Sequence, residues 1–213
     1  MFVRTRMTAN PYTVGPDNSV PEAVAIMEEH KVRWLPVVKE GRLVGVLSEG
    51  DIAKAMPSKA TSLAAGEVLY LLEKLKVSQV MSPDPIIVAP DALLEEAALL
   101  MRDHKVEMLP VVEDGRVVGV ITDGVMFDTL IEMLGFRDSG TRLTIELDDR
   151  PGVLMRVGAI TAKHRTNITH VAVIGTQFER AVIVLGLNSL KTDEIEAELA
   201  EAGYNVIYKL RNN

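Results

Sequence analysis

The heptapeptide GVLSEGD at residues 45–51 places a serine hydroxyl and an aspartate carboxylate three positions apart, within and directly after an apolar run. The heptapeptide GVITDGV at residues 119–125 keeps a hydroxyl at Thr122 but carries Val125 where the first copy has Asp51. A hydroxyl and a carboxylate at this spacing either form a capping box at a helix start or offer hydrogen-bonding groups to a ligand. Asp51 is the first candidate functional residue, because the second copy lacks its chemistry.

The two heptapeptides lie inside a longer internal duplication. Residues 30–52 and 104–126 are identical at 13 of 23 aligned positions. The same offset of 74 residues pairs Met7 with Met81, well outside the aligned segment. Agreement over this length indicates that a whole module has been duplicated, so the residues around Asp51 are positioned by elements that occur twice.

Each copy predicts the same small α/β unit. A short strand precedes an amphipathic helix, which in the first copy begins with the capping-box spacing Ser19-x-x-Glu22. Two β-branched runs joined by a glycine turn predict a hairpin, and a second helix begins at Ser48 or Thr122. The short strands are expected at residues 12–14 and 86–88, and a helix linking the two copies at residues 61–76.

The chain changes character after residue 140. Residues 142–148 alternate apolar and polar side chains, as a half-buried strand does. The sequence DRPGVL at residues 149–154 then predicts a turn into a helix, followed by two strands, a second helix and a last strand. The order βαββαβ predicts a ferredoxin-like sandwich in which two helices back one sheet.

Composition limits the partners and the chemistry. Apolar residues make up 47% of the chain and charged residues 25%, as in soluble globular proteins, and the net charge of −7 argues against nucleic acid or an acidic membrane as the partner. The absence of cysteine excludes disulfides and thiolate chemistry. The sequence shows no apolar run of ~18 residues and no signal peptide, so a cytoplasmic location is expected.

The sequence also gives no sign of a metal site or of catalysis. His164 and His170 lack carboxylates at ligand spacing, so no metal site is expected. The sequence shows no pairing of a nucleophile with a base, and the modules account for the chain without a separate catalytic domain. The chain is therefore expected not to be an enzyme.

Several of these motifs resemble those of the CBS domain, which occurs in tandem as a pair with two clefts. The resemblance is carried by the H-x-V-x-x-L-P-V-V runs at residues 30–38 and 104–112 and by the G-h-h-S/T-x-x-D motif that ends at Asp51. The C-terminal part resembles an ACT domain through residues 149–154 and Asn167. The order CBS–CBS–ACT resembles the acetoin utilization protein B family.

The resemblance implies an α/β fold class built of α+β modules, in which a tandem CBS domain pair is followed by a βαββαβ ferredoxin-like ACT domain. It also implies the limits of the modules. These are residues 1–60 for the first CBS domain, 61–76 for the linking helix, 77–136 for the second CBS domain and 141–213 for the ACT domain.

CBS pairs hold adenosine derivatives, so the resemblance implies a regulatory adenine nucleotide (AMP, ADP or ATP) or S-adenosylmethionine, and no catalytic cofactor. Asp51 is expected to accept hydrogen bonds from both ribose hydroxyls, and Ser48 lies at a helix N-terminus that favours phosphate. Arg33 is expected to pair with the phosphate, a solvated surface charge being the alternative. The expected nucleotide site comprises Thr13, Val14, Arg33, Pro36, Ser48 and Asp51, with the backbone of Thr13 and Val14 against the adenine edge.

The second copy is expected to hold a degenerate nucleotide site. Val125 cannot accept the ribose hydroxyls, and Glu107 replaces Arg33 and is expected to repel a phosphate. These two losses predict one competent nucleotide site per chain. The degenerate site comprises Glu107, Thr122, Asp123 and Val125.

The resemblance to ACT domains leaves two roles open for the C-terminal part, an amino-acid site or a dimerisation surface. The amino-acid site would comprise Asp149, Pro151, Gly152 and Asn167. The whole chain is then expected to be a non-catalytic sensor that works as a homodimer and signals to a client enzyme, with acetoin utilisation as a candidate pathway. The alternative is an interaction scaffold with vestigial ligand pockets.

Overall fold

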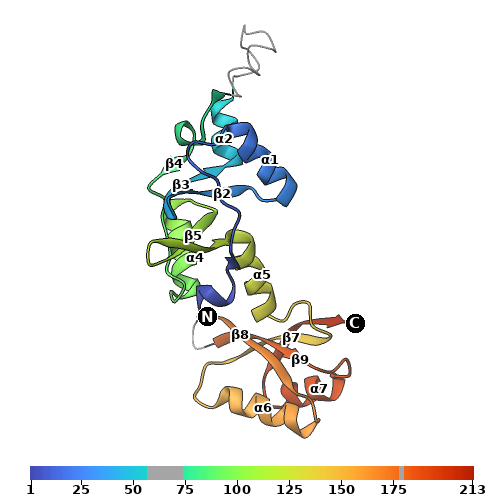
Figure 1. Cartoon of the computed structure of the whole chain (residues 1–213). Helices are drawn as coiled ribbons and strands as arrows, with labels where there is room; N and C mark the ends of the chain where they lie inside the picture. The colour runs from blue at the N-terminus through green and yellow to red at the C-terminus, as the bar shows by residue number, and fades with distance from the viewer. Residues whose placement is uncertain (57–73, 178–179) are drawn as a thin grey trace. The chain divides into compact units, whose positions relative to one another are not determined.

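The computed structural model divides into two compact units, Met1–Met126 and Phe127–Asn213 (Figure 1). The structure describes residues 1–56, 74–177 and 180–213, so most of the predicted linking helix lies outside the described residues. Both units combine helices with antiparallel sheets, which confirms the predicted fold class. The module limits expected from the sequence stay predictions.

The two repeats make up the first unit, apart from the last helix, which continues beyond Met126, and each repeat has the order helix, strand, strand, helix. The short strands expected before these helices are reduced to single parallel bridges, Val14 to Val37 and Val88 to Val111. The elements are α1 (Val20–His30), β2 (Trp34–Lys39), β3 (Arg42–Ser48) and α2 (Glu49–Ala55) in the first repeat, and α4 (Leu94–His104), β5 (Met108–Glu113), β6 (Arg116–Thr122) and α5 (Asp123–Met133) in the second.

The start of α1 confirms the capping box expected from the sequence. The Ser19 N–H donates to Glu22 Oε2 over 2.9 Å, and the Glu22 N–H donates to Ser19 Oγ over 3.4 Å. Val20, Ala23 and Met27 are buried on the inner face of the helix. The helix ends at Lys31, which adopts the left-handed conformation with φ of 54°.

The hairpins of the two repeats have the same register. Each is closed by a two-residue turn whose residues both have positive φ, Glu40-Gly41 in the first repeat and Asp114-Gly115 in the second. Such turns match the right-handed twist of the paired strands. The register places Trp34 opposite Ser48 in the first repeat. The hydroxyl noted in the sequence therefore lies beside an aromatic ring.

Each repeat completes its sheet with a segment that precedes the other repeat in the chain. Strand β1 (Thr8–Ala9) pairs with β6 of the second repeat, and β4 (Ser82–Pro83) pairs with β3 of the first. The buried side chain of Val3, in the 3-10 helix η1 (Val3–Thr5), belongs to the core of the second repeat. The buried Val77, in η2 (Val77–Gln79), belongs to the core of the first. The two repeats are therefore interlocked.

The second unit is one four-stranded antiparallel sheet backed by two helices. The strand order is β10-β7-β9-β8, and Figure 1 shows α6 and α7 on one face of this sheet. Leucine and isoleucine side chains of the central strands pack against both helices in a single core. This arrangement confirms the predicted βαββαβ sandwich. Its elements are β7 (Gly140–Asp148), α6 (Val153–Lys163), β8 (Ile168–Gln177), β9 (Arg180–Leu187), α7 (Asp193–Glu201) and β10 (Asn205–Asn212).

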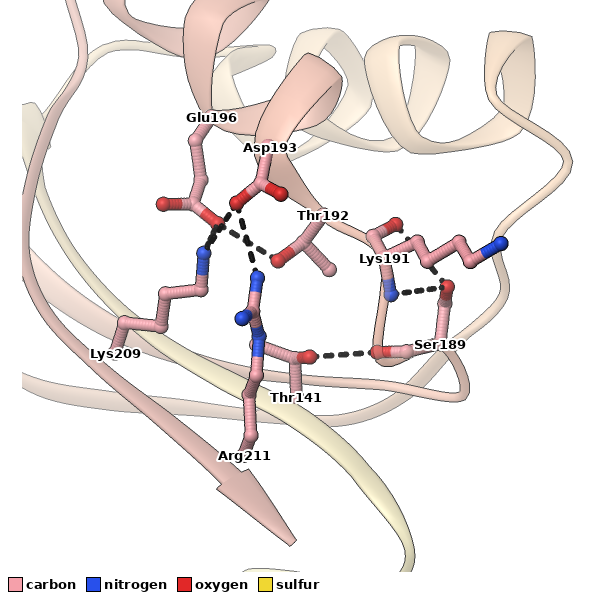
Figure 2. A network of polar contacts seen from close by, with 8 residues as sticks. All are labelled: Thr141, Ser189, Lys191, Thr192, Asp193, Glu196, Lys209 and Arg211. Atoms are coloured by element: carbon pink, nitrogen blue, oxygen red, sulfur yellow. Dashed lines mark hydrogen bonds and ion pairs between the residues drawn. The ribbon is translucent and has the colours of Figure 1, made fainter. Parts of the chain in front are cut away.

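An ion network ties the start of α7 to the edge strand β10 (Figure 2). Lys209 Nζ and Arg211 Nη2, both on β10, donate to Asp193 Oδ1 over 2.8 and 2.9 Å. Lys209 also pairs with Glu196, which accepts from Thr192 Oγ1 over 2.7 Å. The hydrogen bond from Lys209 lowers the pKa of Asp193 below its ordinary value of 3.8, and Arg211 adds to this effect.

We expect Lys209→Met to raise the pKa of Asp193, and NMR titration of the Asp193 carboxyl carbon measures this change. Because the pKa of Asp193 in the folded chain lies below 3.8, its ion pair stabilises the fold above that pH and is lost as the pH falls through the lowered value. The variant should therefore lose less unfolding free energy than the wild type as the pH falls below about 4.

Lys191→Met is the matched control, because Lys191 joins this region through its backbone hydrogen bonds with Ser189. It should leave the titration of Asp193 as in the wild type. Equal pKa values for Asp193 in the wild type and in Lys209→Met would show that the network does not hold this carboxylate charged.

Candidate functional site

Two clefts in the first unit are lined by both repeats. The Asp51 cleft has a volume of about 420 Å³ and the Thr122 cleft about 440 Å³, within the range of small-molecule sites. Most residues that line one cleft have a counterpart 74 positions away in the other. The Asp51 cleft is lined by Arg33, Trp34, Val46, Ser48, Glu49, Gly50, Asp51, Lys54, Ser82, Pro85, Ile86, Lys105, Val106 and Glu107, and the Thr122 cleft by Thr8, Ala9, Asn10, Pro11, Tyr12, Lys31, Val32, Arg33, Trp34, Met108, Val120 and Thr122.

Asp51 and Ser48 form a capping box and also line the cleft. Asp51 Oδ2 accepts hydrogen bonds from Ser48 Oγ over 2.6 Å and from the Ser48 N–H over 3.0 Å. The Asp51 N–H in turn donates to Ser48 Oγ over 3.0 Å. Within the described part of the chain, the side-chain hydrogen bonds of Asp51 all use Oδ2. The second carboxylate oxygen, Oδ1, is therefore available to accept from a ligand.

The N–H groups at the start of α2 are less available than the sequence suggested. The Glu49 N–H donates to the carbonyl of Arg33 over 3.1 Å, and the Asp51 N–H is taken by Ser48. The helix is only seven residues long, so its dipole is small. The expected phosphate role of this helix start is therefore weakly supported by the geometry.

Arg33 and Glu107 were expected in separate sites, but the structure brings them together. Arg33 Nη2 lies 3.4 Å from Glu107 Oε2, and Arg33 Nε lies 3.4 Å from Glu49 Oε2. The guanidinium group lies over the ring of Trp34 at 4.7 Å from the centroid. Glu107 lines the Asp51 cleft, whereas Arg33 lines both clefts. The carboxylate expected to repel phosphate in the second site instead neutralises the arginine of the first.

Three residues of the expected nucleotide site, Thr13, Val14 and Pro36, do not line either cleft. Val14 is buried, its N–H donates to the Pro36 carbonyl over 3.1 Å, and its carbonyl accepts from the Val38 N–H over 2.9 Å. These backbone groups are engaged in the bridge between Val14 and β2. Thr13 is exposed before this bridge. The structure thus separates Thr13, Val14 and Pro36 from Ser48 and Asp51.

The place expected for those residues is taken by a segment of the other repeat. Ser82, Pro85 and Ile86 line the Asp51 cleft because β4 pairs with β3. Lys54 and Lys105 also line this cleft and were not singled out from the sequence. No local pattern marks the pairing of the two-residue β4 with a strand so far away in the chain.

The residues of the expected degenerate site are only partly brought together. Thr122 lines its cleft, and its Oγ1 accepts from the Val125 N–H over 3.4 Å. The side chain of Val125 packs against the core of the second repeat. Asp123 Oδ1 accepts from the Gly124 N–H over 2.7 Å. The side chain that replaces Asp51 is therefore partly buried against this core and is not among the residues that line the cleft.

In the C-terminal unit, the four residues expected to bind an amino acid do not meet in one chain. Gly152 precedes α6 with φ of 85°, and Pro151 lines a small cavity of about 200 Å³. Asp149 follows the last residue of β7, whereas Asn167 precedes β8 at the opposite end of the sheet. This follows from the register, because Ile168 pairs with Leu187, which pairs with Thr141 at the start of β7. Asn167 donates its N–H to Asn188 Oδ1 over 2.8 Å instead.

The described residues offer neither a cluster of metal ligands nor a membrane-spanning helix. Within residues 1–56, 74–177 and 180–213, no three carboxylate or imidazole side chains are grouped as a metal ion requires. His164 Nε2 lies 2.8 Å from Glu198 Oε2, and His170 Nδ1 lies 3.6 Å from Asp138 Oδ2, so the two histidines have different partners. In that same part of the chain, no helix has the length and apolarity needed to cross a bilayer.

The two interlocked αββα repeats with paired clefts define a CBS domain pair. The family model of the CBS domain matches residues 3–58 and 77–130, and the model of the TTHA0829-like ACT domain matches residues 139–209. The chain belongs to the CBS-domain family and carries a C-terminal ACT domain.

Two similar proteins match about two thirds of the chain. The CBS domain-containing protein YhcV of Bacillus subtilis is 30% identical over 142 residues, 67% of this chain and 92% of that protein. A solved structure described as an acetoin utilization protein (AcuB) from Vibrio cholerae is 30% identical, with a TM-score of 0.53, over 65% of this chain and 96% of that one. The resemblance stated from the sequence motifs is thereby confirmed.

Two further solved structures contain adenosyl compounds. CBSX2 in complex with AMP is 31% identical, with a TM-score of 0.53, over 62% of this chain and 97% of that chain. The CBS domain pair of MJ0100, in complex with 5′-methylthioadenosine and S-adenosylmethionine, is 27% identical, with a TM-score of 0.51, over 61% of this chain and 95% of that chain. Inosine-5′-monophosphate dehydrogenase of Staphylococcus haemolyticus is 37% identical over 119 residues, but the match covers only 21% of that enzyme.

Proposed function

We propose that this chain is a non-catalytic regulatory protein that binds an adenosyl compound in the Asp51 cleft. The observation that carries the proposal is the wall of that cleft, where a carboxylate with one available oxygen lies beside a hydroxyl and an aromatic ring. The complexes of CBSX2 with AMP and of the MJ0100 pair with two adenosyl compounds support an adenosine-derived ligand.

The groups around Asp51 suit the two halves of a nucleoside. Asp51 Oδ1 can accept from both hydroxyls of a ribose, since a carboxylate oxygen has two lone pairs. Trp34, Pro85 and Ile86 supply the flat apolar surface that a purine ring requires. The hydrogen bonds between Asp51 and the ribose fix the position of the ligand, and burial of the purine against the apolar wall supplies much of the binding free energy.

Binding regulates only if the ligand has different affinities for two states of the protein. We propose that the states belong to a homodimer in the cytoplasm that acts on a metabolic enzyme, with the ACT domain as the dimerisation surface or as a second site for an amino acid. The likeness to AcuB supports a link to acetoin utilisation. These finer assignments depend on identification of the ligand.

Equilibrium titration of the full chain with adenosine, AMP and S-adenosylmethionine tests the proposal. Trp34 is the single tryptophan and lines both clefts, so its fluorescence should change as an adenosyl compound binds. At 100 times its dissociation constant, the ligand should stabilise the fold by about 2.7 kcal/mol. Guanosine is the control for purine selectivity. Absence of saturable binding by all three adenosyl compounds would favour the scaffold with vestigial pockets.

A further inference from the structure

The two clefts differ in the charges that line them. The Asp51 cleft is lined by three cations and three carboxylates, so it carries no net charge. The Thr122 cleft is lined by Lys31 and Arg33, and none of the described residues that line it is acidic. Because Arg33 is paired with Glu49 and Glu107, the positive charge particular to the Thr122 cleft is that of Lys31.

In the Asp51 cleft, the strongest phosphate-binding group is already paired. Arg33 lies 3.4 Å from both Glu107 and Glu49, and all three side chains line this cleft. A phosphate that reached Arg33 from this side would lie beside two carboxylates as well. The backbone N–H groups of Glu49 and Asp51 are occupied too. An adenosyl ligand without net negative charge meets neither obstacle.

The Thr122 cleft presents the opposite situation. Lys31 lines this cleft and makes no ion pair within the described part of the chain, whereas Arg33, which lines it too, is paired with Glu49 and Glu107. Tyr12 and Trp34 give the cleft an aromatic wall, and Tyr12 is held in place by stacking on His30 at 3.6 Å between ring centroids. A lysine without an ion pair beside an aromatic wall suits a nucleotide, whose phosphate is anionic and whose base is aromatic.

We propose that the two clefts select ligands by charge. The Asp51 cleft takes an adenosyl compound without net negative charge, and the Thr122 cleft takes a phosphate-bearing nucleotide, with Lys31 on the phosphate. The first half of this assignment rests on the proposed function, whereas the second half depends only on the charges of the Thr122 cleft.

The duplication supplies a matched pair of lysines for the test. Lys31 lines only the Thr122 cleft, and Lys105, its counterpart 74 positions later, lines only the Asp51 cleft. Each follows the last residue of its helix in the left-handed conformation, with φ of 54° and 55°. Lys31→Gln and Lys105→Gln therefore make the same chemical change in the same backbone setting, one in each cleft.

The experiment is calorimetric titration of the full-length variants with AMP and with adenosine. We expect Lys31→Gln to weaken AMP binding about tenfold, the equivalent of about 1.4 kcal/mol, and to leave adenosine binding within about twofold. Lys105→Gln should change AMP binding by less than about twofold, because phosphate does not enter its cleft. AMP should also bind in the presence of saturating adenosine. Thermal unfolding of both variants checks that the fold is equally retained.

Three results would overturn the inference. The first is a larger loss of AMP affinity in Lys105→Gln than in Lys31→Gln, the second is an equal loss in both, and the third is simple competition between AMP and adenosine for one site. Failure of the proposed function has a different signature. In that case the affinity for adenosine would be insensitive to substitution of Asp51, while the affinity for AMP would still depend on Lys31.

Discussion

Replacement of Asp51 by valine, the residue of the second repeat, should weaken adenosine binding by about 10- to 100-fold. The carboxylate is the acceptor proposed for both ribose hydroxyls, and loss of the partner of a buried hydroxyl costs about 1–3 kcal/mol. Each 1.4 kcal/mol corresponds to about a tenfold change in affinity. Calorimetric titration of the full chain with adenosine measures the effect.

The same substitution removes the capping box, so a loss of fold has to be separated from a loss of contact. Ser48→Ala breaks the side-chain cap and leaves the Asp51 carboxylate in place. A lost cap costs about 0.5–2 kcal/mol of stability, which thermal unfolding of both variants will show. Ser48→Ala should retain most of the adenosine affinity.

A second control changes the ligand and leaves the protein intact. The wild type should prefer adenosine to 2′-deoxyadenosine by about tenfold, because Asp51 accepts from the 2′-hydroxyl that only adenosine carries. Asp51→Val should bind the two compounds nearly equally, because the variant has no acceptor for that hydroxyl. An unchanged preference in the variant would mean that Asp51 does not hold the ribose, and the capping role alone would remain.

The local structure of both repeats was predictable because its signals are local. The helix starts at Ser19 and Ser48 follow from capping spacings, and both capping boxes are present. The hairpin turns follow from a glycine between β-branched runs. In the C-terminal part, strict alternation of apolar side chains identified the first strand of the sheet. Patterns of this kind involve residues within a few positions of one another.

The composition of the cleft was less predictable, because it depends on the exchange of two short segments between the repeats. The pairings of Thr8 with Val120 and of Ser82 with Val46 each join a strand of only two residues, β1 or β4, to a longer strand of the other repeat. Strands this short have no hydrophobic periodicity of their own. The sequence therefore indicated Thr13 beside Asp51, whereas the structure places Ile86 there.

Equivalent positions of the two repeats can also contact each other, and an alignment of the repeats does not show such a contact. An alignment of the repeats makes Arg33 and Glu107 equivalent. It therefore predicts that Arg33 belongs to the site of the first repeat and Glu107 to the site of the second. In a pair with approximate two-fold symmetry, however, residues near the axis meet their own counterparts, as these two do at 3.4 Å. The difference between the copies at this position therefore produces one ion pair, and its arginine lines both clefts.

Replacement of Gly119 by valine should detach the N-terminal segment from the second repeat. A Cβ atom at Gly119 would lie 2.6 Å from Met7 Sδ and 3.1 Å from the Thr8 carbonyl oxygen, which is tighter than van der Waals contact allows. The methionine can move, but the Thr8 carbonyl belongs to the backbone of β1. Overpacking of this kind costs about 1–3 kcal/mol of unfolding free energy. Since Thr8 lines the Thr122 cleft, that cleft should lose its shape first.

The duplication again provides the comparison that makes this prediction specific. A Cβ atom at Gly45 would lie 2.6 Å from Met81 Sδ and 3.0 Å from the Ser82 carbonyl oxygen, so Gly45→Val should detach β4 and disturb the Asp51 cleft instead. Hydrogen exchange should rise in residues 1–9 for Gly119→Val and in residues 77–83 for Gly45→Val, while urea unfolding gives the stability loss.

Gly175→Val on β8, where a Cβ atom meets nothing within 4 Å, controls for the substitution itself. If Gly119→Val were no less stable than Gly175→Val and showed no faster exchange near Thr8, the interlocking of the repeats would not be what shapes the clefts.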